Sequence, residues 1–343
     1  MLDSDGTSRI LQLDGDAIIR GLTFKDGDTG GGGNGGAINS DSSSDLTVED
    51  SVFVNNQGNH GGAIDTSDGV IIIRSSTFTG NTADVDGGAV HAYVDLDLVI
   101  DSEFTNNHAE DDGGAIYVDD DVLDGDGDGE SGLIGNTFSG NTADGDGGAV
   151  EIDGDFLISA VITQNTFLNN VGDDGGAFDF DGLVAGTISS NRFIGNYATG
   201  DGGAIDADDI VASTVITRNT FLRNTSEDDG GALRLDDDTG SESDLAVISG
   251  NMFRSNRATG DGGGIYIGFN NTTMAPKFVT RNSFRSNRAG GIGGGIAIMG
   301  LFECVPEITT RQAARAFKKN KYKYNRASGS RRSMNVGAVP CVN

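Results

Sequence analysis

The sequence is built from one short repeat that recurs along nearly its whole length, and such periodicity restricts a chain to repetitive folds. One of its two signatures is Phe-x-x-Asn, which begins at Phe53, Phe78, Phe104, Phe138, Phe167, Phe193, Phe221, Phe253 and Phe284. The other is Gly-Gly-(Ala or Gly)-apolar, which begins at Gly35, Gly61, Gly87, Gly113, Gly147, Gly175, Gly202, Gly230, Gly262 and Gly293. Each phenylalanine lies eight or nine residues before the next Gly-Gly pair, so both signatures belong to one unit.

Short runs of β-branched residues, such as Val70–Phe78 and Thr214–Phe221, separate the signatures and predict strands. Helices are not expected, because glycine interrupts every candidate window and no 3.6-residue period persists. Successive Gly-Gly pairs are 26 to 34 residues apart. We therefore predict an all-β fold, a single right-handed parallel β-helix of about ten coils.

In a parallel β-helix, equivalent residues of successive coils form columns about 4.8 Å apart. The phenylalanine column then predicts a buried stack of rings, and the asparagine column predicts a hydrogen-bonded ladder at a turn. The Gly-Gly pair fits a second corner, where positive φ and close backbone approach are needed. A second asparagine column precedes the phenylalanines by two residues, at Asn136, Asn165, Asn191, Asn219, Asn251 and Asn282.

The paired signatures resemble the repeat of the polymorphic outer membrane proteins first known from chlamydiae, within the pectin-lyase-like β-helix superfamily. The resemblance covers roughly residues 10 to 300. It implies a surface-exposed or secreted β-helix, often adhesive.

The charge is strongly acidic but unevenly distributed. The chain has 52 Asp and Glu against 23 Lys and Arg, a formal charge of −29, which opposes binding to nucleic acid and anionic membrane. Residues 301–343 instead hold nine Lys and Arg against two Glu. We expect residues 1–300 to form the β-helix and residues 301–343 to form a basic cap or tail docked on the acidic solenoid. Cys304 and Cys341 flank this segment and either pair or stay free.

An aspartate column is predicted at the Gly-Gly corner. The residue before Gly-Gly is acidic in seven coils, at Asp86, Asp112, Asp146, Asp174, Asp201, Asp229 and Asp261. A further acidic column lies at Asp84, Asp111, Asp144, Asp173 and Asp228. Stacked carboxylates repel one another and offer the oxygen ligands that Ca²⁺ prefers, so this column is a candidate metal site. The alternative is that each aspartate caps its turn by accepting backbone N–H bonds.

The longest coil contains an acidic insertion, residues 120–130, which we expect to form a surface loop. Its Asp124, Asp126 and Asp128 match the first half of an EF-hand calcium loop, but position 12 would be Gly135 instead of Glu. These three aspartates are a second calcium candidate. Asn270 and Asn271 lie in glycosylation sequons, whereas the sequon asparagine Asn224 belongs to the ladder.

No catalytic constellation is evident. A lyase needs a basic residue beside carboxylates, and Arg74, Arg218 and Arg281 fall near one coil position without forming a unique group. His60, His91 and His108 occupy unmatched positions, so no histidine cluster is expected. We predict no catalytic residues.

The expected function is that of a non-catalytic secreted or cell-surface protein with an adhesive or structural role and divalent cations as ligands. Expected partners are a cell-surface or matrix protein, a polysaccharide or further copies of the solenoid. Two alternatives stay open: an enzyme acting on acidic polysaccharide, marked by a unique Arg or Lys next to a carboxylate cleft, and an acidic protein adapted to high salt. No signal-peptide pattern follows Met1 and no long apolar run exists, so we expect a fragment or a truncated reading frame of an extracellular protein.

Overall fold

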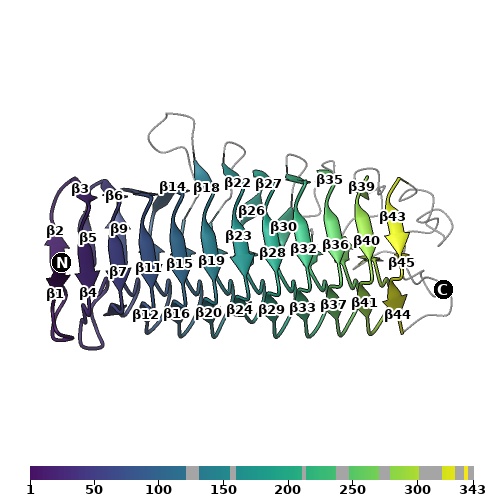
Figure 1. Ribbon diagram of the computed structural model, residues 1–343, viewed down its shortest axis with the longest axis horizontal. Coiled ribbons are helices and arrows are strands. Elements are labelled where there is room, and N and C mark those ends of the chain that lie inside the picture. The colour runs from purple at the N-terminus through teal and green to yellow at the C-terminus, as the bar shows by residue number, and fades with distance from the viewer. Residues whose placement is uncertain are drawn as a thin grey trace.

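The described residues form one elongated rod of stacked coils, with β1 (Leu2–Asp3) and β43 (Lys321–Lys323) at opposite ends (Figure 1). The computed structural model describes residues 1–120, 131–154, 160–210, 214–236, 247–269, 279–300, 319–328 and 336–338. Every strand pair in this part of the chain is parallel, and each strand pairs with its equivalent in the neighbouring coil. The predicted parallel β-helix of about ten coils is confirmed. The described residues contain no helix that is long and apolar enough to cross a membrane.

Each coil contributes short strands to four ladders, which we number in chain order as sheets I to IV. Sheet I holds the Phe-x-x-Asn phenylalanine, and sheet II follows the asparagine. Sheet III follows the Gly-Gly corner, and sheet IV returns the chain to sheet I. Sheet I consists of β1 (Leu2–Asp3), β4 (Thr23–Lys25), β7 (Val52–Val54), β11 (Thr77–Thr79), β15 (Glu103–Thr105), β19 (Thr137–Ser139), β23 (Thr166–Leu168), β28 (Arg192–Ile194), β32 (Thr220–Leu222), β36 (Met252–Arg254), β40 (Ser283–Arg285) and β43 (Lys321–Lys323). Sheet II consists of β8 (Gln57–Gly58), β12 (Thr82–Ala83), β16 (His108–Ala109), β20 (Thr142–Ala143), β24 (Val171–Gly172), β29 (Tyr197–Ala198), β33 (Thr225–Ser226), β37 (Arg257–Ala258), β41 (Arg288–Ala289) and β44 (Arg326–Ala327).

Sheet III is divided into two runs that isolated bridges at Ile205 connect. Its first run is β2 (Leu11–Leu13), β5 (Ile38–Ser43), β9 (Ile64–Asp68), β13 (Val90–Ala92), β17 (Ile116–Val118), β21 (Val150–Ile152) and β25 (Phe178–Phe180), and its second run is β34 (Leu233–Leu235), β38 (Ile265–Phe269), β42 (Ile296–Gly300) and β45 (Val336–Ala338). Sheet IV is β3 (Ala17–Arg20), β6 (Leu46–Glu49), β10 (Val70–Arg74), β14 (Asp95–Ile100), β18 (Gly132–Ile134), β22 (Val161–Thr163), β27 (Thr187–Ser189), β31 (Val215–Thr217), β35 (Val247–Ser249) and β39 (Val279–Thr280). A separate pair joins β26 (Leu183–Val184) to β30 (Asp209–Ile210).

The predicted phenylalanine stack runs through the core on the inner side of sheet I. Phe138, Phe167 and Phe193 occupy consecutive rungs, with ring centroids 4.9 and 4.8 Å apart and all three side chains fully buried. The stack is longer than expected, because Phe24 precedes it and Tyr322 extends it beyond Phe284 at 5.2 Å. Offset aromatic contact therefore adds to the apolar burial of each coil.

Both predicted asparagine columns are buried hydrogen-bonded ladders. The Asn170 side chain is typical: its Nδ2 donates to Oδ1 of Asn196 at 3.1 Å and to the Phe138 carbonyl at 3.2 Å. Its Oδ1 accepts from the backbone N–H of Asn141 at 2.9 Å. The strand ladders leave some backbone N–H and C=O groups at the turns without a partner. An asparagine side chain of the next coil forms the missing hydrogen bonds to them.

The Gly-Gly pair has the conformational role expected of it. Gly175 has φ +56°, and a Cβ on it would lie 2.3 Å from the carbonyl oxygen of Phe178. A Cβ on Gly176 would lie 2.5 Å from the backbone of Tyr197. Substitution of either glycine would therefore displace backbone, which explains why the pair recurs at this corner.

The ladders continue past residue 300, into the segment expected to be a cap or tail. β43 pairs with β40, β44 pairs with β41, and Asn325 accepts a hydrogen bond from Nδ2 of Asn287 at 3.1 Å. Residues 319–328 therefore dock on the neighbouring coil through strand pairing. The role of opposite charge in docking the rest of residues 301–343 stays a prediction. Cys304, Cys341, Asn270 and Asn271 lie outside the described residues.

Candidate cation-binding face

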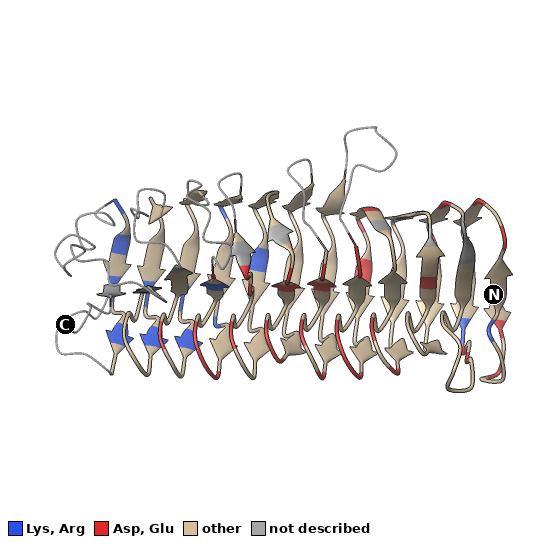
Figure 2. Cartoon of the chain, turned by 180° about the vertical axis from the view of Figure 1, so that it is seen from behind, with Lys and Arg blue, Asp and Glu red and all other residues tan. Residues whose placement is uncertain are grey.

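The acidic side chains gather along the rod beside the Gly-Gly corner (Figure 2). Three columns make up this surface, which we call the acidic band. The first column is the residue before Gly-Gly, the second is the middle residue of each sheet III strand, and the third lies two residues after the second. In the central coils the first column is Asp146 and Asp174, the second is Glu151, Asp179 and Asp206, and the third is Asp153, Asp181 and Asp208.

The first column forms a continuous ladder of turn caps. The backbone N–H of Asp146 donates to Oδ1 of Asp112 at 2.7 Å, and the backbone N–H of Asp174 donates to Oδ1 of Asp146 at 2.7 Å. The same bond joins each successive pair from Asp86 to Asp261, and Ile292 donates to Asp261 at 2.5 Å. Each aspartate of the first column therefore caps a turn. The cap uses one oxygen of each carboxylate and does not use the other oxygen, so calcium binding by this column stays a prediction.

Partial burial changes the proton affinity of this first column. Burial is the largest cause that raises the pKa of Asp112, Asp201 and Asp229, and neighbouring aspartates add to it. The backbone hydrogen bond, together with Arg234 in the case of Asp201, opposes the rise, and the resulting pKa is about 6. The column is accordingly less charged near pH 6 than its composition suggests.

The second column is polar and yet buried. Glu151, Asp179 and Asp206 are only 2%, 3% and 3% exposed, although each lies between two core residues of its strand and points away from the core. Buried carboxylates require a compensating charge or a proton. The band supplies that compensation differently along its length.

At the N-terminal end the compensating group is a histidine. His91 Nδ1 lies 2.7 Å from Asp65 Oδ1, and His91 Nε2 lies 3.6 Å from Asp119 Oδ2. Burial alone would lower the pKa of His91, but hydrogen bonds to Asp119 and Asp65 and their negative charge together raise it to about 9. His91 is therefore a protonated counter-ion at neutral pH.

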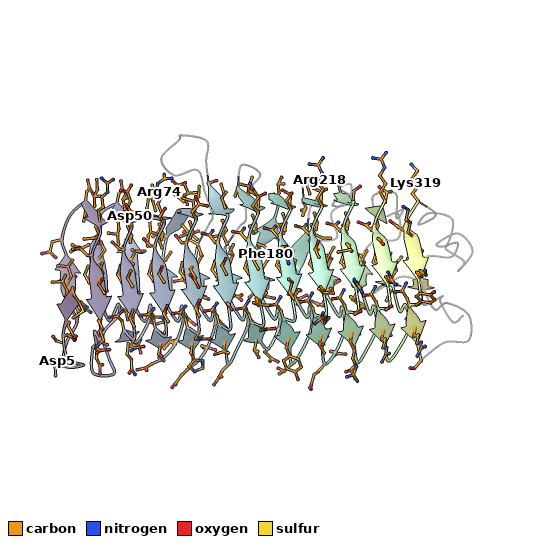
Figure 3. The ribbon with its side chains drawn as sticks, in the orientation of Figure 1. Asp5, Asp50, Arg74, Phe180, Arg218 and Lys319 are labelled. Carbon is orange, nitrogen blue, oxygen red and sulfur yellow. The ribbon has the colours of Figure 1, made fainter. Side chains whose placement is uncertain are left out.

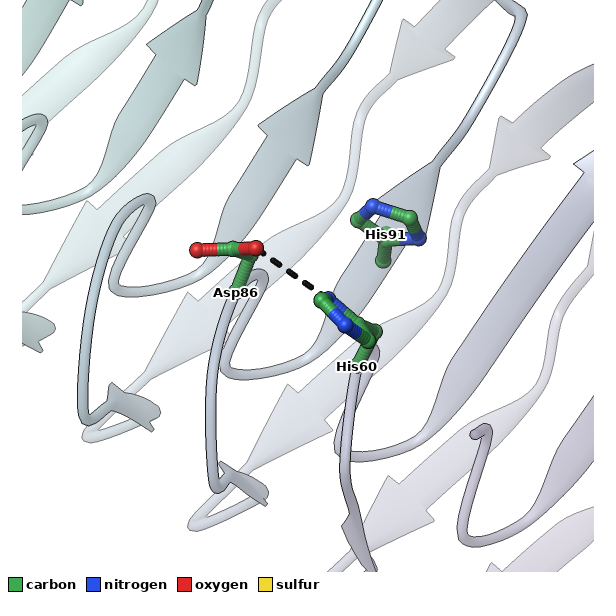
Figure 4. A group of neighbouring side chains, drawn as sticks. All are labelled: His60, Asp86 and His91. Atoms are coloured by element: carbon green, nitrogen blue, oxygen red, sulfur yellow. Dashed lines mark ion pairs between the residues drawn. The ribbon is translucent and has the colours of Figure 1, made fainter. Parts of the chain in front are cut away.

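His60 adjoins this group, contrary to the expectation that the histidines are unrelated. It holds the first-column position, its Nδ1 lies 3.1 Å from Asp86 Oδ2, and its ring lies 4.9 Å from the ring of His91 (Figure 4). Their ligand atoms and that of Asp86 lie within 4.8 Å of one another. His108 lies apart, on sheet II, where its Nδ1 is 2.9 Å from Thr142 Oγ1.

At the C-terminal end of the band the compensating group is Arg234, in the second column. Its guanidinium contacts Asp206 Oδ2 at 2.8 Å, Asp236 Oδ2 at 3.0 Å, Asp201 Oδ2 at 3.2 Å and also Asp208. The side chain is 18% exposed. One arginine thus neutralises carboxylates from all three columns.

The central coils contain no such group. Glu151, Asp179 and Asp181 bring their ligand atoms within 4.8 Å of one another. Burial raises the pKa of Glu151 and Asp179 well above the usual range, and the surrounding carboxylates raise both further. Among the charges that act most strongly on these three residues, none belongs to a described Lys, Arg or His.

The family follows from five segments that match the model of the Chlamydia polymorphic membrane protein repeat, at residues 75–93, 101–119, 137–152, 192–208 and 252–268. Each contains one Phe-x-x-Asn, one Gly-Gly corner and strands of sheets I and II. Four of them also contain residues of a sheet III strand, and segment 192–208 has the isolated bridge at Ile205 instead. The chain contains repeats of this family. No curated protein and no solved structure matches the chain.

Outside the acidic band, the polymorphic membrane protein repeats place the other predicted residues apart from one another. Arg218 and Arg281 lie at an exposed positive-φ corner between sheets IV and I, and Arg74 lies one position earlier in its coil (Figure 3). They form no group with carboxylates of the band. Asp124, Asp126 and Asp128 lie outside the described residues, so the calcium-loop prediction stays a prediction.

Arg234, Glu151 and Asp179 are site residues that sequence reasoning missed. A signal for them exists in the repeats, because the residue after Gly-Gly-Ala-apolar is polar in coil after coil, as at Asp65, His91, Glu151, Asp179, Asp206 and Arg234. The last coil was missed for a simpler reason. Asn320, Tyr322 and Asn325 reproduce both asparagine columns around a tyrosine in place of the phenylalanine.

Proposed function

We propose that this chain is a non-catalytic cell-surface β-helix that adheres to acidic polysaccharide through a basic face at its C-terminal end. The surface location is supported by its polymorphic membrane protein repeats. The single observation that supports the ligand is a cluster of seven exposed cations on an otherwise acidic rod (Figure 2): Arg254, Arg257, Arg285, Arg288, Lys321, Lys323 and Arg326.

Strand register aligns these cations in columns. Arg254, Arg285 and Lys323 are consecutive partners on sheet I. Arg257, Arg288 and Arg326 are consecutive partners on sheet II, and Lys321 pairs with Ser283 at the edge of the same face. The basic face, as we call these seven residues, therefore presents positive charge at the strand spacing of about 4.8 Å.

The basic face lacks internal neutralisation. Residues 279–300 and 319–328 contain no Asp or Glu, and no ion pair joins any of the seven cations to a described acidic residue. Stacked like charges repel one another, so a polyanion that lies along the columns relieves a repulsion that folding imposes. Arginine also favours carboxylate and sulfate groups, because its planar fork donates two parallel hydrogen bonds.

The uneven charge also favours one orientation. The acidic band would be repelled by an anionic glycan layer while the basic face is attracted. The rod would then approach such a layer with its C-terminal end, which suits an adhesive spacer.

Arg234 has the surroundings that would mark a polysaccharide lyase, namely one basic residue beside several carboxylates. Its protonation argues against that role. Although burial disfavours the guanidinium charge, the carboxylates of Asp206 and Asp208 outweigh burial and raise the pKa of Arg234 above its already high value. A residue held so firmly in its charged form cannot accept a proton from substrate, so we assign Arg234 to charge compensation.

Binding to immobilised heparin, a sulfated uronate polymer, tests the proposal. We expect Arg257→Gln with Arg288→Gln to weaken binding at least tenfold, because the two substitutions remove adjacent charges from the sheet II column of the basic face. Arg192→Gln is the matched control, since Arg192 is exposed on β28 of sheet I but lies outside the face. Equal losses in both variants, or no binding by the wild-type protein in 0.15 M NaCl, would contradict the proposal.

A further inference from the structure

The centre of the acidic band has a feature that an ordinary acidic surface lacks. Glu151 Oε2 and Asp179 Oδ1 are buried without any hydrogen-bond partner, and their residues are 2% and 3% exposed. Asp179 and Glu151 are register partners in β21 and β25, so the two carboxyl groups are stacked in successive coils. Buried carboxylate oxygens are normally paired, and an orphaned pair indicates that a binding partner is missing.

The coils along the band differ in whether a cationic side chain compensates their buried carboxyl groups, and this difference indicates that the missing partner is a cation. In the second column, His91 compensates Asp65 and Asp119, and Arg234 compensates Asp206 together with three other aspartates. Between these two residues the same column contains Tyr117, Glu151, Asp179 and Asp206, none of which is cationic. The fold therefore places a cation in the second column at both ends of the band and leaves the central coils without one.

From these observations we infer that Glu151, Asp179 and Asp181 form a binding site for a single divalent cation, with calcium as the ion that suits it best. The three ligand atoms lie within 4.8 Å of one another, close enough for one ion to contact all of them after small side-chain adjustments. All three donors are carboxylate oxygens, which favours a hard cation such as Ca²⁺ over Zn²⁺. Asp181 is exposed and provides the route from solvent.

The site is distinct from the first column of the band. Those aspartates already accept backbone N–H bonds, and Asp146 acts on Glu151 and Asp179 only through its charge. Tyr117 is the register partner of Glu151 in the preceding coil, and its hydroxyl donates to Asp153 Oδ2 at 3.1 Å. An aromatic side chain thus lies one strand spacing from the site, and it provides a local probe.

The competing explanation is that protons alone compensate these carboxyl groups. Carboxylate oxygens of Asp179 and Asp181 lie within 4.8 Å of each other, and a proton shared by the two groups would relieve their repulsion when no metal is bound. Calcium would displace that proton, so the affinity for calcium should rise with pH. If protons alone compensate these carboxyl groups, the protein would release or absorb no heat on addition of calcium at any pH.

Calorimetric titration of the metal-free full chain with CaCl₂ at pH 8 tests the inference. We expect Glu151→Gln with Asp179→Asn to weaken the tightest calcium site at least tenfold and to raise the melting temperature without calcium, because buried repulsion is removed. Asp144→Asn, an exposed carboxylate in the same coil as Glu151, is the matched control and should leave both unchanged. The same affinity in the double variant and wild type, or no saturable binding by wild type, would overturn the inference.

Terbium provides a second readout that locates the ion. Tb³⁺ replaces Ca²⁺ at oxygen sites, and excitation of Tyr117 should sensitise its luminescence in the wild-type protein. Tyr117→Phe should abolish most of this signal while the calcium-dependent shift in melting temperature persists. Luminescence unchanged by this substitution would place the ion elsewhere. The basic face binds heparin without a metal, so heparin binding can be measured in the presence of EDTA. A result that contradicts the metal site therefore does not affect the test of the basic face.

Discussion

Glu151 and Asp179 are register partners in adjacent strands, and both carboxyl groups are buried beside the Gly-Gly corner. Two acidic side chains in such a position conflict with the usual exposure of charged residues. His91 and Arg234 resolve this conflict towards the two ends of the band, whereas the central coils place no described cationic side chain beside their buried carboxyl groups.

The asparagine ladder should contribute strongly to stability. Asn170→Ala removes the acceptor for the Asn141 backbone N–H and the donor to the Phe138 carbonyl, both of which are buried. Each orphaned group costs about 1 to 3 kcal/mol, so we expect a loss of about 3 kcal/mol or more. Urea denaturation monitored by circular dichroism measures it. Thr166→Ala, at an outward position of the same coil, should cost less than about 1 kcal/mol.

The phenylalanine stack gives a parallel expectation. Phe167→Ala opens a cavity between Phe138 and Phe193, and we expect a loss of about 3 to 5 kcal/mol. Hydrogen exchange should show that protection falls first in the strands that flank this coil. Unchanged protection there would mean that neighbouring rings close the gap.

Much of this architecture can be predicted from the sequence because repetition converts one position into a column. Phe138, Asn141 and Gly147 could each be assigned to core, turn and corner from spacing alone, and the structure confirms all three. The burial of Glu151 could not be predicted in this way. An outward strand position is ordinarily exposed, and here the adjoining Gly-Gly corner covers it: a Cβ on Gly147 would lie 2.5 Å from Glu151 Oε2.

Arg234 and Tyr322 illustrate two further limits of the sequence. Three of the four aspartates around Arg234 come from the preceding coil and Asp236 comes from its own coil, so their convergence depends on a fold that places them in adjacent columns. The place of Tyr322 in the aromatic stack could not be predicted, because tyrosine replaces the phenylalanine of the repeat there. The basic charge of the surrounding segment also indicated a cap or tail instead of a further coil.

Stability should depend on pH through His91. The pKa of His91 is about 9 in the folded chain and 6.5 ordinarily, so its contribution is fully present below pH 6.5 and is lost as pH rises through about 9. We expect a loss of about 3 kcal/mol across this window. His91→Gln should flatten that part of a melting-temperature profile, whereas His108→Gln should not. The raised pKa values of buried carboxyl groups also lower the stability as pH rises. The contribution of His91 is therefore the difference between the profiles of the wild-type protein and His91→Gln.

The first-column aspartates allow calcium binding to be separated from screening. Millimolar Ca²⁺ should raise the melting temperature more than NaCl of equal ionic strength, since specific ligands stabilise the folded state by mass action. Asp174→Asn with Asp201→Asn keeps the Oδ1 acceptors of the turn caps but removes two charges. We expect this variant to reduce the calcium-specific part. Equal shifts in CaCl₂ and NaCl would favour adaptation to high salt instead.

Enzymatic turnover is not expected. Incubation with pectate and alginate between pH 5 and pH 10, with calcium present, should give no rise in the absorbance of unsaturated products. Should turnover occur and disappear in Arg234→Gln but persist in Arg218→Gln, the carboxylates around Arg234 would have to be reconsidered as a lyase centre. Loss of turnover in Arg74, Arg218 or Arg281 variants would likewise contradict the adhesive function.

The salt dependence of heparin binding tests the central claim most directly, because adhesion through aligned cations must release counterions from the polymer. We predict that the logarithm of the dissociation constant rises linearly with the logarithm of NaCl concentration, and that Arg257→Gln with Arg288→Gln makes the slope shallower. Arg192→Gln should leave the slope of the wild-type protein unchanged. A slope that is the same in all three proteins would show that the basic face does not contact the polysaccharide and would contradict the proposed function.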